Sequence, residues 1–266
     1  SATRQQYVDA VEEVRRRIAA GDVYQANVCR VLSAPVPDPA AADVAGLASL
    51  LRSGNPAPYG GFVRLPDHGV HVATASPELF LRREAGVVES GPIKGTGRTA
   101  EDLAPKDSAE NVMIVDLVRN DLGAVCETGS VTVPRLLDVE QHPGLVHLVS
   151  TVRGRLRADA TWPRILEASF PPGSVTGAPK SSALRIIDAV EGASRGPYCG
   201  AVGWVDADAG TAELAVAIRT FWLDGHEVRF GTGAGITWGS DPLREWDETE
   251  LKAATLLTVA AGSVAG

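Results

Sequence analysis

The stretch that organises this chain is Ser90-Gly91-Pro92-Ile93-Lys94-Gly95-Thr96-Gly97-Arg98-Thr99. Its three glycines let the backbone bend tightly and approach a ligand closely, and its proline fixes one turn position. We therefore expect a loop that sets the direction of the Lys94 amine. In a dry cleft that amine could act as a nucleophile or bind an anion, whereas the plainer alternative is a solvated lysine in a turn. Taken alone, this stretch favours a solvated lysine in a turn. The motifs elsewhere in the chain favour a functional amine.

Length and charge narrow the class of protein. The 266 residues are 44% hydrophobic and suit one large folded domain or two closely packed lobes. The net charge is −8 and the richest basic run, Arg15-Arg16-Arg17, is short, so nothing indicates a nucleic-acid-binding surface. The three cysteines lack CxxC spacing, which argues against a disulfide framework or structural zinc and favours a reducing, cytoplasmic setting. No apolar run approaches the ~20 residues of a membrane helix.

Hydrophobic periodicity outlines the secondary structure. It predicts helices over residues 7–18, 44–52, 105–122, 162–168, 181–190 and 241–261. It predicts strands over residues 23–32, 60–65, 70–75, 79–83, 87–90, 130–133, 136–140, 145–152, 199–205, 213–223 and 227–233. Short connections between the strands from 60 to 90 predict an antiparallel meander that leads into the Lys94 loop. The whole pattern is mixed α and β with mostly antiparallel connections.

Two of these helices each carry a pair of carboxylates three residues apart. The pairs are Asp107 with Glu110, and Glu245 with Glu248, and each pair shares one helix face. The first pair could simply complement the helix dipole. If the two pairs came together, they would form an oxygen-rich site for a hard divalent cation, with Mg²⁺ as the default.

Two glycine-rich segments and two single residues are further candidates. Residues 170–180 form a Gly, Ser and Thr loop that opens onto a helix, which suits an anion but lacks P-loop spacing. Residues 231–235 are a second close-approach loop, without the βαβ context of a dinucleotide site. Glu78 follows a proline at a strand junction, where a solvated turn carboxylate is the plainer reading. His147 stands in an apolar run, where a hydrogen-bonded core histidine is commoner than a catalyst.

Several longer motifs occur in one order along the chain. They are Pro92-Ile93-Lys94-Gly95-Thr96, Glu110-Asn111-Val112-Met113-Ile114-Val115-Asp116-Leu117-Val118-Arg119-Asn120-Asp121-Leu122, His147-Leu148-Val149-Ser150, Thr176-Gly177-Ala178-Pro179-Lys180 and Glu245-Trp246-Asp247-Glu248-Thr249. Together they resemble the chorismate-binding enzymes, from about Thr3 to Ala261. The resemblance implies an α+β fold of layered antiparallel sheets, a sandwich flanked by helices. It also implies a single catalytic domain over residues 1–266, with the family's usual amino-terminal segment absent.

The resemblance assigns roles to individual residues. Glu110 and Glu248 are expected to bind Mg²⁺ directly, and Asp107 and Glu245 through water, although many relatives have Glu in place of Asp107. Glu78 is expected to be the general acid and base near the 4-hydroxyl of chorismate. The remaining roles are the orientation of the substrate ring by His147 and the binding of the substrate by Gly95, Thr96, Ser174, Tyr198, Arg219, Gly233, Ala234, Gly235 and Lys252.

Two positions distinguish members of the family. Isochorismate and salicylate synthases place a lysine base where this chain has Gln25, and a glutamine cannot take a proton from water. Anthranilate synthases usually have Ala where this chain has Lys94, and a lysine there is typical of aminodeoxychorismate synthases. The resemblance thus implies amination of chorismate for p-aminobenzoate and folate synthesis, with Lys94 forming a covalent adduct.

The same resemblance implies partners and leaves alternatives. Ammonia is expected from a glutamine amidotransferase on another chain, because no amidotransferase cysteine motif is evident here. Anthranilate synthase component I is the alternative within the family. A non-catalytic chorismate-binding or amidotransferase-docking module is the alternative of another class.

Overall fold

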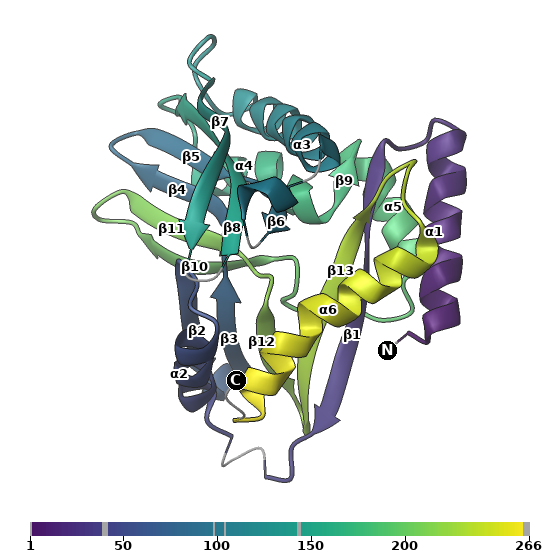
Figure 1. The fold of residues 1–266 in the computed structure, drawn as a ribbon. Helices are drawn as coiled ribbons and strands as arrows, with labels where there is room; N and C mark the ends of the chain where they lie inside the picture. The colour runs from purple at the N-terminus through teal and green to yellow at the C-terminus, as the bar shows by residue number, and fades with distance from the viewer. Residues whose placement is uncertain (1, 39–41, 98, 104, 143–144, 263–266) are drawn as a thin grey trace. The chain divides into compact units, whose positions relative to one another are not determined.

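Two antiparallel β-sheets form in the computed structural model, each within its own unit of the chain (Figure 1). The first unit comprises Ser1–Pro77, Val175–Gly200 and Ala217–Gly266, and the second comprises Glu78–Ser174 and Ala201–Val216. The structure describes residues 2–38, 42–97, 99–103, 105–142 and 145–262. The predicted α+β class is confirmed, and the predictions of a single domain and of sheet-on-sheet layering stay predictions.

The first unit has a six-stranded sheet in the order β2-β3-β12-β13-β1-β9. Its strands are β1 (Gln25–Pro35), β2 (Tyr59–Leu65), β3 (Val70–Ser76), β9 (Gly177–Ala178), β12 (Thr220–Asp224) and β13 (Glu227–Ile236). Its helices are α1 (Arg4–Ala19), α2 (Val44–Gly54), α5 (Lys180–Val190) and α6 (Pro242–Ala260). The pairing of β1 with β13, from Ala26 opposite Ile236 to Pro35 opposite Glu227, is the longest pairing of this sheet among the described residues.

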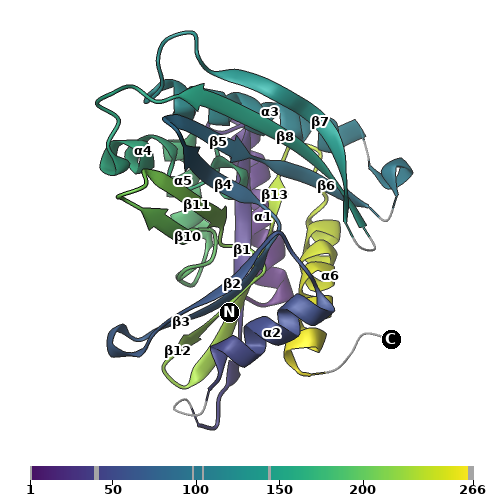
Figure 2. The same ribbon diagram turned by 90° about the vertical axis from the view of Figure 1, so that its left-hand side faces the viewer.

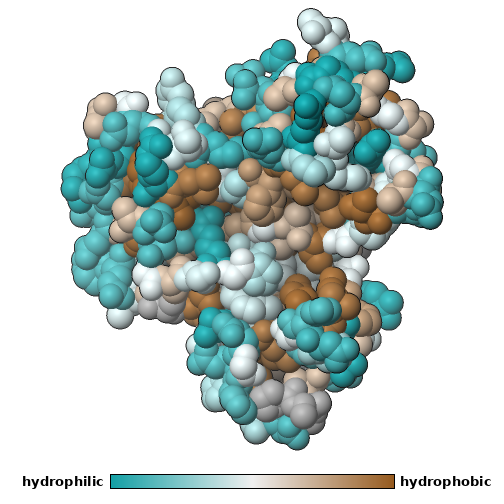
Figure 3. Space-filling view, turned by 180° about the vertical axis from the view of Figure 1, so that it is seen from behind, coloured by the Kyte–Doolittle hydropathy of each residue, from teal (hydrophilic) through white to brown (hydrophobic). Residues whose placement is uncertain are grey.

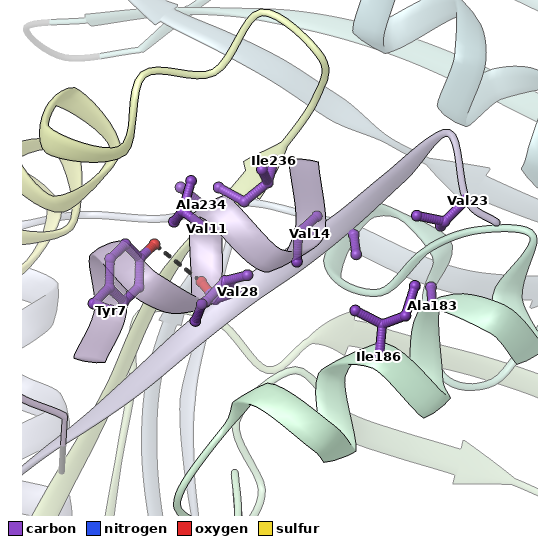
Figure 4. Packing of buried hydrophobic residues seen from close by; sticks show 11 residues of the cluster. Tyr7, Val11, Val14, Val23, Val28, Ala183, Ile186, Ala234 and Ile236 are labelled. Atoms are coloured by element: carbon purple, nitrogen blue, oxygen red, sulfur yellow. Dashed lines mark hydrogen bonds between the residues drawn. The ribbon is translucent and has the colours of Figure 1, made fainter. Parts of the chain in front are cut away.

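Helix α1 forms because Thr3 caps it and because its apolar residues recur on one face. The Thr3 hydroxyl accepts from the Gln6 N–H, and the Gln6 side chain accepts from the Thr3 N–H, which completes a capping box. Val11 and Val14 are fully buried in a cluster with residues of β1, β13 and α5 (Figure 4). The Tyr7 hydroxyl donates to the Val28 carbonyl at 3.1 Å, so the polar end of the ring is satisfied inside this core.

The second unit has a seven-stranded sheet in the order β10-β11-β4-β5-β8-β6, with β7 on the other side of β8. Its strands are β4 (Leu79–Glu84), β5 (Val87–Gly91), β6 (Ile93–Gly97), β7 (Thr132–His142), β8 (Leu145–Arg155), β10 (Ala201–Asp206) and β11 (Thr211–Val216). Its helices are α3 (Pro105–Gly123) and α4 (Trp162–Ser169). Helix α3 packs against β8, β6 and β7, and Figure 2 shows it behind β8.

A buried amide ties α3 to this sheet. Asn111 is fully buried, and its Nδ2 donates to the carbonyl oxygens of Leu148 at 3.3 Å and Pro92 at 3.5 Å. Its Oδ1 accepts from the hydroxyl of Ser150. The residue before β6 and the strand β8 are therefore held by the same helical side chain.

The predicted meander is wrong at Ser76-Pro77-Glu78. Strands β2 and β3 form one hairpin in the first sheet, and β4 and β5 form another in the second sheet. The chain changes sheets between Ser76 and Leu79, since proline cannot donate to a continuing ladder. Local sequence shows each hairpin, but the pairing of one hairpin with the next depends on tertiary contacts.

The Lys94 segment is a strand rather than a loop. Residues of β6 pair with β8, and the register shifts between Lys94 and Thr96. Gly95, with φ of +73°, occupies this bulge. The glycines suggested a free loop, whereas they permit a bulge inside a ladder.

Three other predicted boundaries also change. Residues 213–223 divide into β11 and β12 in different sheets, with Arg219 at φ +51° between them. Residues 231–235 lie within β13 rather than in a loop. Residues 132–142 form one strand, β7, instead of two, because register shifts and the positive φ of Leu137 (57°) absorb the interruption.

Within the described residues, no helix is both long and apolar enough to cross a membrane. On the face shown in Figure 3, hydrophobic residues are interspersed with hydrophilic ones.

Candidate active site

Glu78 is a buried carboxylate at the start of the second unit. The residue is 5% exposed, and burial raises the pKa of its carboxyl group to about 7. The hydroxyl of Ser174, the positive charge of Lys94 and the N–H of Ile93 each favour the ionised form and limit that rise. A carboxyl group with this pKa is present in both protonation states near neutral pH, as a general acid and base requires.

Lys94 lies on β6 beside the same group of residues. It is half-buried, and its Nζ lies 3.5 Å from the carbonyl oxygen of Ser174. Ser174 therefore contacts both groups, because its hydroxyl bonds the Glu78 carboxylate. The second unit thus brings together the amine, the acid and the serine that the sequence predicted.

The bulge at Gly95 brings β6 close to α3. A Cβ on Gly95 would lie 3.0 Å from Cβ and 3.1 Å from Oδ2 of Asp107, so the strand fits only with glycine here. Asp107 and Glu110 are half-buried in the first part of α3. Both predicted carboxylates of this pair therefore belong to the same unit as Lys94, and Asp107 lies directly beside its strand.

His147 is in the middle of the β6–β8–β7 region. It is 2% exposed, and its cross-strand neighbours are Thr96 on β6 and Glu140 on β7. The backbone of Thr96 belongs to β6, and its side chain is not among those that the structure describes. The strand places His147 two residues from Val149, which pairs with Ile93.

Four predicted residues of the first unit lie around the end of β13. Gly233 pairs with Cys29 of β1, and Gly235 pairs with Asn27. Gly233 and Ala234 are buried, and Gly235 is half-buried. The ring of Tyr198 lies against Gly231, where an added Cβ would be 2.1 Å from the ring. Tyr198 therefore packs on the strand that carries the predicted carboxylate-binding backbone.

Arg219 is the positive-φ residue in the segment of chain that joins β11 to β12. Its φ is +51°, its carbonyl accepts from the Ala75 N–H at 3.0 Å, and burial lowers its pKa. A guanidinium that loses hydration in this way gains from an anionic partner. This environment suits the predicted role of binding a substrate carboxylate.

Helix α6 carries the second carboxylate pair and Lys252. Glu245 is 8% exposed, and Glu248 is half-buried. Burial raises the pKa of the Tyr7 hydroxyl, and the charges of Cys29, Glu245 and Glu248 raise it further. The Nζ of Lys252 lies 2.7 Å from Glu248 and donates to the Gly233 carbonyl at 3.1 Å. Lys252 thus connects a predicted metal ligand to the predicted substrate-binding strand.

The donor chemistry fits the predicted cation. Each unit supplies one carboxylate pair, and carboxylate oxygens are the ligands that Mg²⁺ prefers. The contact of Glu248 with the Lys252 ammonium shows that this carboxylate already has a cationic neighbour. Within each unit, the described residues contain no group of three or more His, Cys, Asp and Glu side chains that could hold a metal.

Sequence reasoning missed a buried ion pair beside Tyr198. Arg195 pairs with Glu191 at 2.6 Å and donates to the carbonyl oxygens of Val175 and Asn27 at 2.9 and 2.7 Å. Glu191 also accepts from the Cys29 N–H at 2.8 Å. The i, i+4 spacing of this pair was a usable signal, but it falls beyond the end of α5, where no helix was expected.

Comparisons with known proteins point to one family of enzymes. The family model described as chorismate binding enzyme matches residues 1–258. An aminodeoxychorismate synthase of Streptomyces pristinaespiralis is 44% identical over 98% of this chain and 37% of its own length. An anthranilate synthase component 1 of Haloarcula marismortui is 42% identical over 93% of this chain and 52% of its own length.

Solved structures share the fold of this chain. The anthranilate synthase component I of Streptococcus pneumoniae superposes with a TM-score of 0.84 and 34% identity, covering 96% of this chain and 58% of that one. The menaquinone-specific isochorismate synthase of Escherichia coli gives a TM-score of 0.82 at 23% identity and shares the fold. This chain spans from about a third to about half of the two curated relatives named above.

Proposed function

Because this chain belongs to the chorismate-binding enzymes, we propose that it aminates chorismate at C4, as component I of an aminodeoxychorismate synthase. Its relatives do not decide between this activity and that of anthranilate synthase, since both names occur at 42–44% identity. The observation that carries the proposal is the contact of Lys94 and Glu78 with the same residue, Ser174. An amine and a carboxyl group held together suit nucleophilic attack with acid assistance.

The reaction proceeds in two displacements. In the first, the neutral Lys94 amine bonds to C2 of chorismate, the ring double bonds shift, and the C4–oxygen bond breaks while Glu78 gives its proton to the leaving hydroxyl. In the second, ammonia bonds to C4, the double bonds shift back, and the C2–nitrogen bond breaks, which releases Lys94. The enolpyruvyl ether stays in place, and the product is 4-amino-4-deoxychorismate.

Substrate binding is assigned to both units. Asp107, Glu110, Glu245 and Glu248 would hold Mg²⁺, which when bound neutralises a substrate carboxylate and offsets negative charge. Substrate carboxylates would also contact Ser174, Tyr198, Arg219, Lys252 and the backbone of Gly95, Thr96, Gly233, Ala234 and Gly235. His147 would orient the ring. Gln25 cannot act as a base, so water is not activated for attack at C2.

Ammonia supply defines the proposed partner. We propose that a glutamine amidotransferase on another chain supplies the ammonia. The product would be used for p-aminobenzoate and folate synthesis in the cytoplasm. Free ammonium salt replaces the partner in a direct test.

Product analysis by mass spectrometry tests the proposal. The protein is incubated with chorismate, MgCl₂ and ammonium chloride, and 4-amino-4-deoxychorismate is the expected product. Lys94→Ala should lose this product and the chorismate-derived mass increase on the protein, while Lys106→Ala, at an exposed lysine on α3, should keep both. Fluorescent anthranilate with pyruvate would assign the protein to anthranilate synthase. Chorismate binding by calorimetry without turnover would assign it to a non-catalytic module.

A further inference from the structure

One edge of β1 is completed by two side chains at the point where its short neighbour β9 ends. The backbone pairing on this edge reaches Asn27, whose N–H donates to the Thr176 carbonyl at 2.7 Å. The Asn27 carbonyl then accepts from Nη2 of Arg195 at 2.7 Å. Two positions further on, the Cys29 N–H on the same edge donates to the Glu191 carboxylate at 2.8 Å. Arg195 and Glu191, which we call the edge ion pair, thus bond the backbone groups that a longer β9 would have paired.

The edge ion pair is buried and its geometry is specific. The side chains of Arg195 and Glu191 are 15% and 7% exposed. Nε and Nη2 of the guanidinium donate to the two carboxylate oxygens at 2.8 and 2.6 Å, and Nη1 donates to the Val175 carbonyl at 2.9 Å. All three guanidinium nitrogens are therefore used. A lysine ammonium cannot reach the same acceptors at once, because it is a single point of charge.

Two groups with proposed roles in substrate binding are attached to this pair through the backbone. Ser174 directly precedes Val175, whose carbonyl is held by Arg195. The Tyr198 N–H donates to the carbonyl of Arg195 at 3.1 Å, in the turn that follows. One arginine therefore holds the end of the Ser174 segment and the turn that carries Tyr198.

The strand held by the edge ion pair has the predicted carboxylate-binding backbone on its other edge. Asn27 lies opposite Gly235 of β13, and Cys29 lies opposite Gly233. A Cβ on Gly233 would lie 2.5 Å from the carbonyl oxygen of Val28, so the two strands are in close contact here. A displacement of β1 therefore also displaces these glycines.

We propose that Arg195 and Glu191 are positioning residues for chorismate, which act through Tyr198, the Ser174 segment and the glycine backbone of β13 without contacting the substrate. The inference rests on the function proposed above. Tyr198 and the glycines are assigned to the substrate carboxylates and not to proton transfer. Loss of the pair should therefore weaken chorismate binding more than it slows the chemical steps.

Two conservative variants test the proposal by steady-state kinetics. Arg195→Lys keeps the positive charge but not the three-nitrogen geometry, and Glu191→Gln keeps an acceptor oxygen for the Cys29 N–H but not the negative charge. In each variant the KM for chorismate should rise about tenfold, whereas kcat and the KM for ammonia should stay within about twofold of wild type. Glu191→Gln is the decisive variant if Arg195→Lys does not fold.

This split distinguishes positioning from a role in stability alone. A pair needed only for folding would lower the folded fraction, which reduces the apparent kcat and leaves the KM unchanged. Calorimetric titration with chorismate and MgCl₂, without ammonium, should show the same weaker binding. The control is Arg17→Lys in the half-exposed Glu13–Arg17 pair of α1, which has the same i, i+4 spacing in the same unit and should bind chorismate like wild type.

The two hypotheses fail in different ways. If wild type makes anthranilate, the proposed amination is wrong, while a selective rise in the KM for chorismate in the two variants still supports the positioning role. If wild type makes aminodeoxychorismate but both variants bind chorismate like wild type, the positioning role alone is overturned, whatever their stability. A wild-type protein that neither binds nor converts chorismate would overturn both.

Discussion

Asn111 on α3 and Ser150 on β8 are joined by a 2.5 Å hydrogen bond inside the second unit. Ser150 in turn accepts from the Leu137 N–H at 3.0 Å, and its own N–H donates to the Pro92 carbonyl at 3.1 Å. Both side chains are fully buried. The pair therefore fixes the backbone that leads into β6 and Lys94, although neither residue carries a predicted chemical role.

Asn111→Leu should destabilise the protein by roughly 2–4 kcal/mol, because it leaves the buried Ser150 hydroxyl and two carbonyl oxygens without their amide partner. Urea denaturation measures the change. The matched control is Asn120→Leu, which lies on the same helix and is exposed. An equal effect of the two substitutions would contradict the proposed network.

The raised pKa of Glu78 predicts a pH-dependent stability. Its folded pKa is about 7 against an ordinary value of 4.5, so between these values the folded protein binds more protons than the unfolded chain. Stability contributed by Glu78 is therefore complete below pH 4.5 and falls as the pH rises through about 7. Glu78→Gln should remove this dependence and be more stable than wild type at pH 8 by roughly 3 kcal/mol.

Denaturation curves at pH 5 and pH 8 measure this difference, with Glu89→Gln, at a surface ion pair with Arg153, as the control. In the same variant, product formation should be lost at both pH values, since the amide cannot supply a proton. An unchanged gap between wild type and Glu78→Gln at the two pH values would argue against a buried acid.

Gly95→Ala should combine backbone strain with a steric conflict. The new Cβ would meet Asp107 at 3.0 Å, and a φ of +73° disfavours any side chain. The control is Gly86→Ala in the β4–β5 hairpin, where φ is +76° and nothing lies within 4 Å of the added atom.

Gly86→Ala should cost about 1 kcal/mol of stability, and Gly95→Ala should cost more and reduce the yield of the Lys94 adduct. Chemical denaturation and protein mass spectrometry provide the two measurements. If both variants formed the adduct like wild type, the contact with Asp107 would have no bearing on the amine.

Gln25→Leu should stabilise the protein. Gln25 is fully buried in β1, and neither atom of its amide has a hydrogen-bond partner among the described residues. Removal of an unsatisfied buried amide gains roughly 1–3 kcal/mol. Asn27→Leu is the contrast, because the Asn27 amide donates to the Cys29 sulfur at 3.0 Å and its loss should destabilise. Thermal unfolding of both variants distinguishes the two cases, and a loss of stability in Gln25→Leu would refute the argument.

Local patterns were enough to predict most elements. The hydrophobic periodicity of α1, α2 and α3 placed these helices to within a few residues, and the hairpins β2–β3 and β4–β5 were predicted from their short connections. The switch of sheets at Pro77 was missed because a proline marks the end of a strand but not which sheet the next strand joins, and the break at Arg219 was missed because it has no local signal. A run of apolar residues has the same sequence pattern whether its strands stay in one sheet or the chain passes to another sheet.

The candidate site, too, could be predicted only in part from the sequence. The family motifs predicted Glu78, Lys94 and Ser174, and these residues meet within one unit. The sequence could not show the burial that raises the pKa of Glu78, because the side chains around this residue come from α3, α4 and β5.

The polypeptide passes from one unit to the other four times, after Pro77, Ser174, Gly200 and Val216. A residue with an assigned role lies within three positions of each passage, namely Glu78, Ser174, Tyr198 and Arg219. Recombination between family members must therefore exchange residues 78–174 and 201–216 together, with the junctions placed away from these four residues. A chimera with a single junction would take the residues with proposed roles from two different parents.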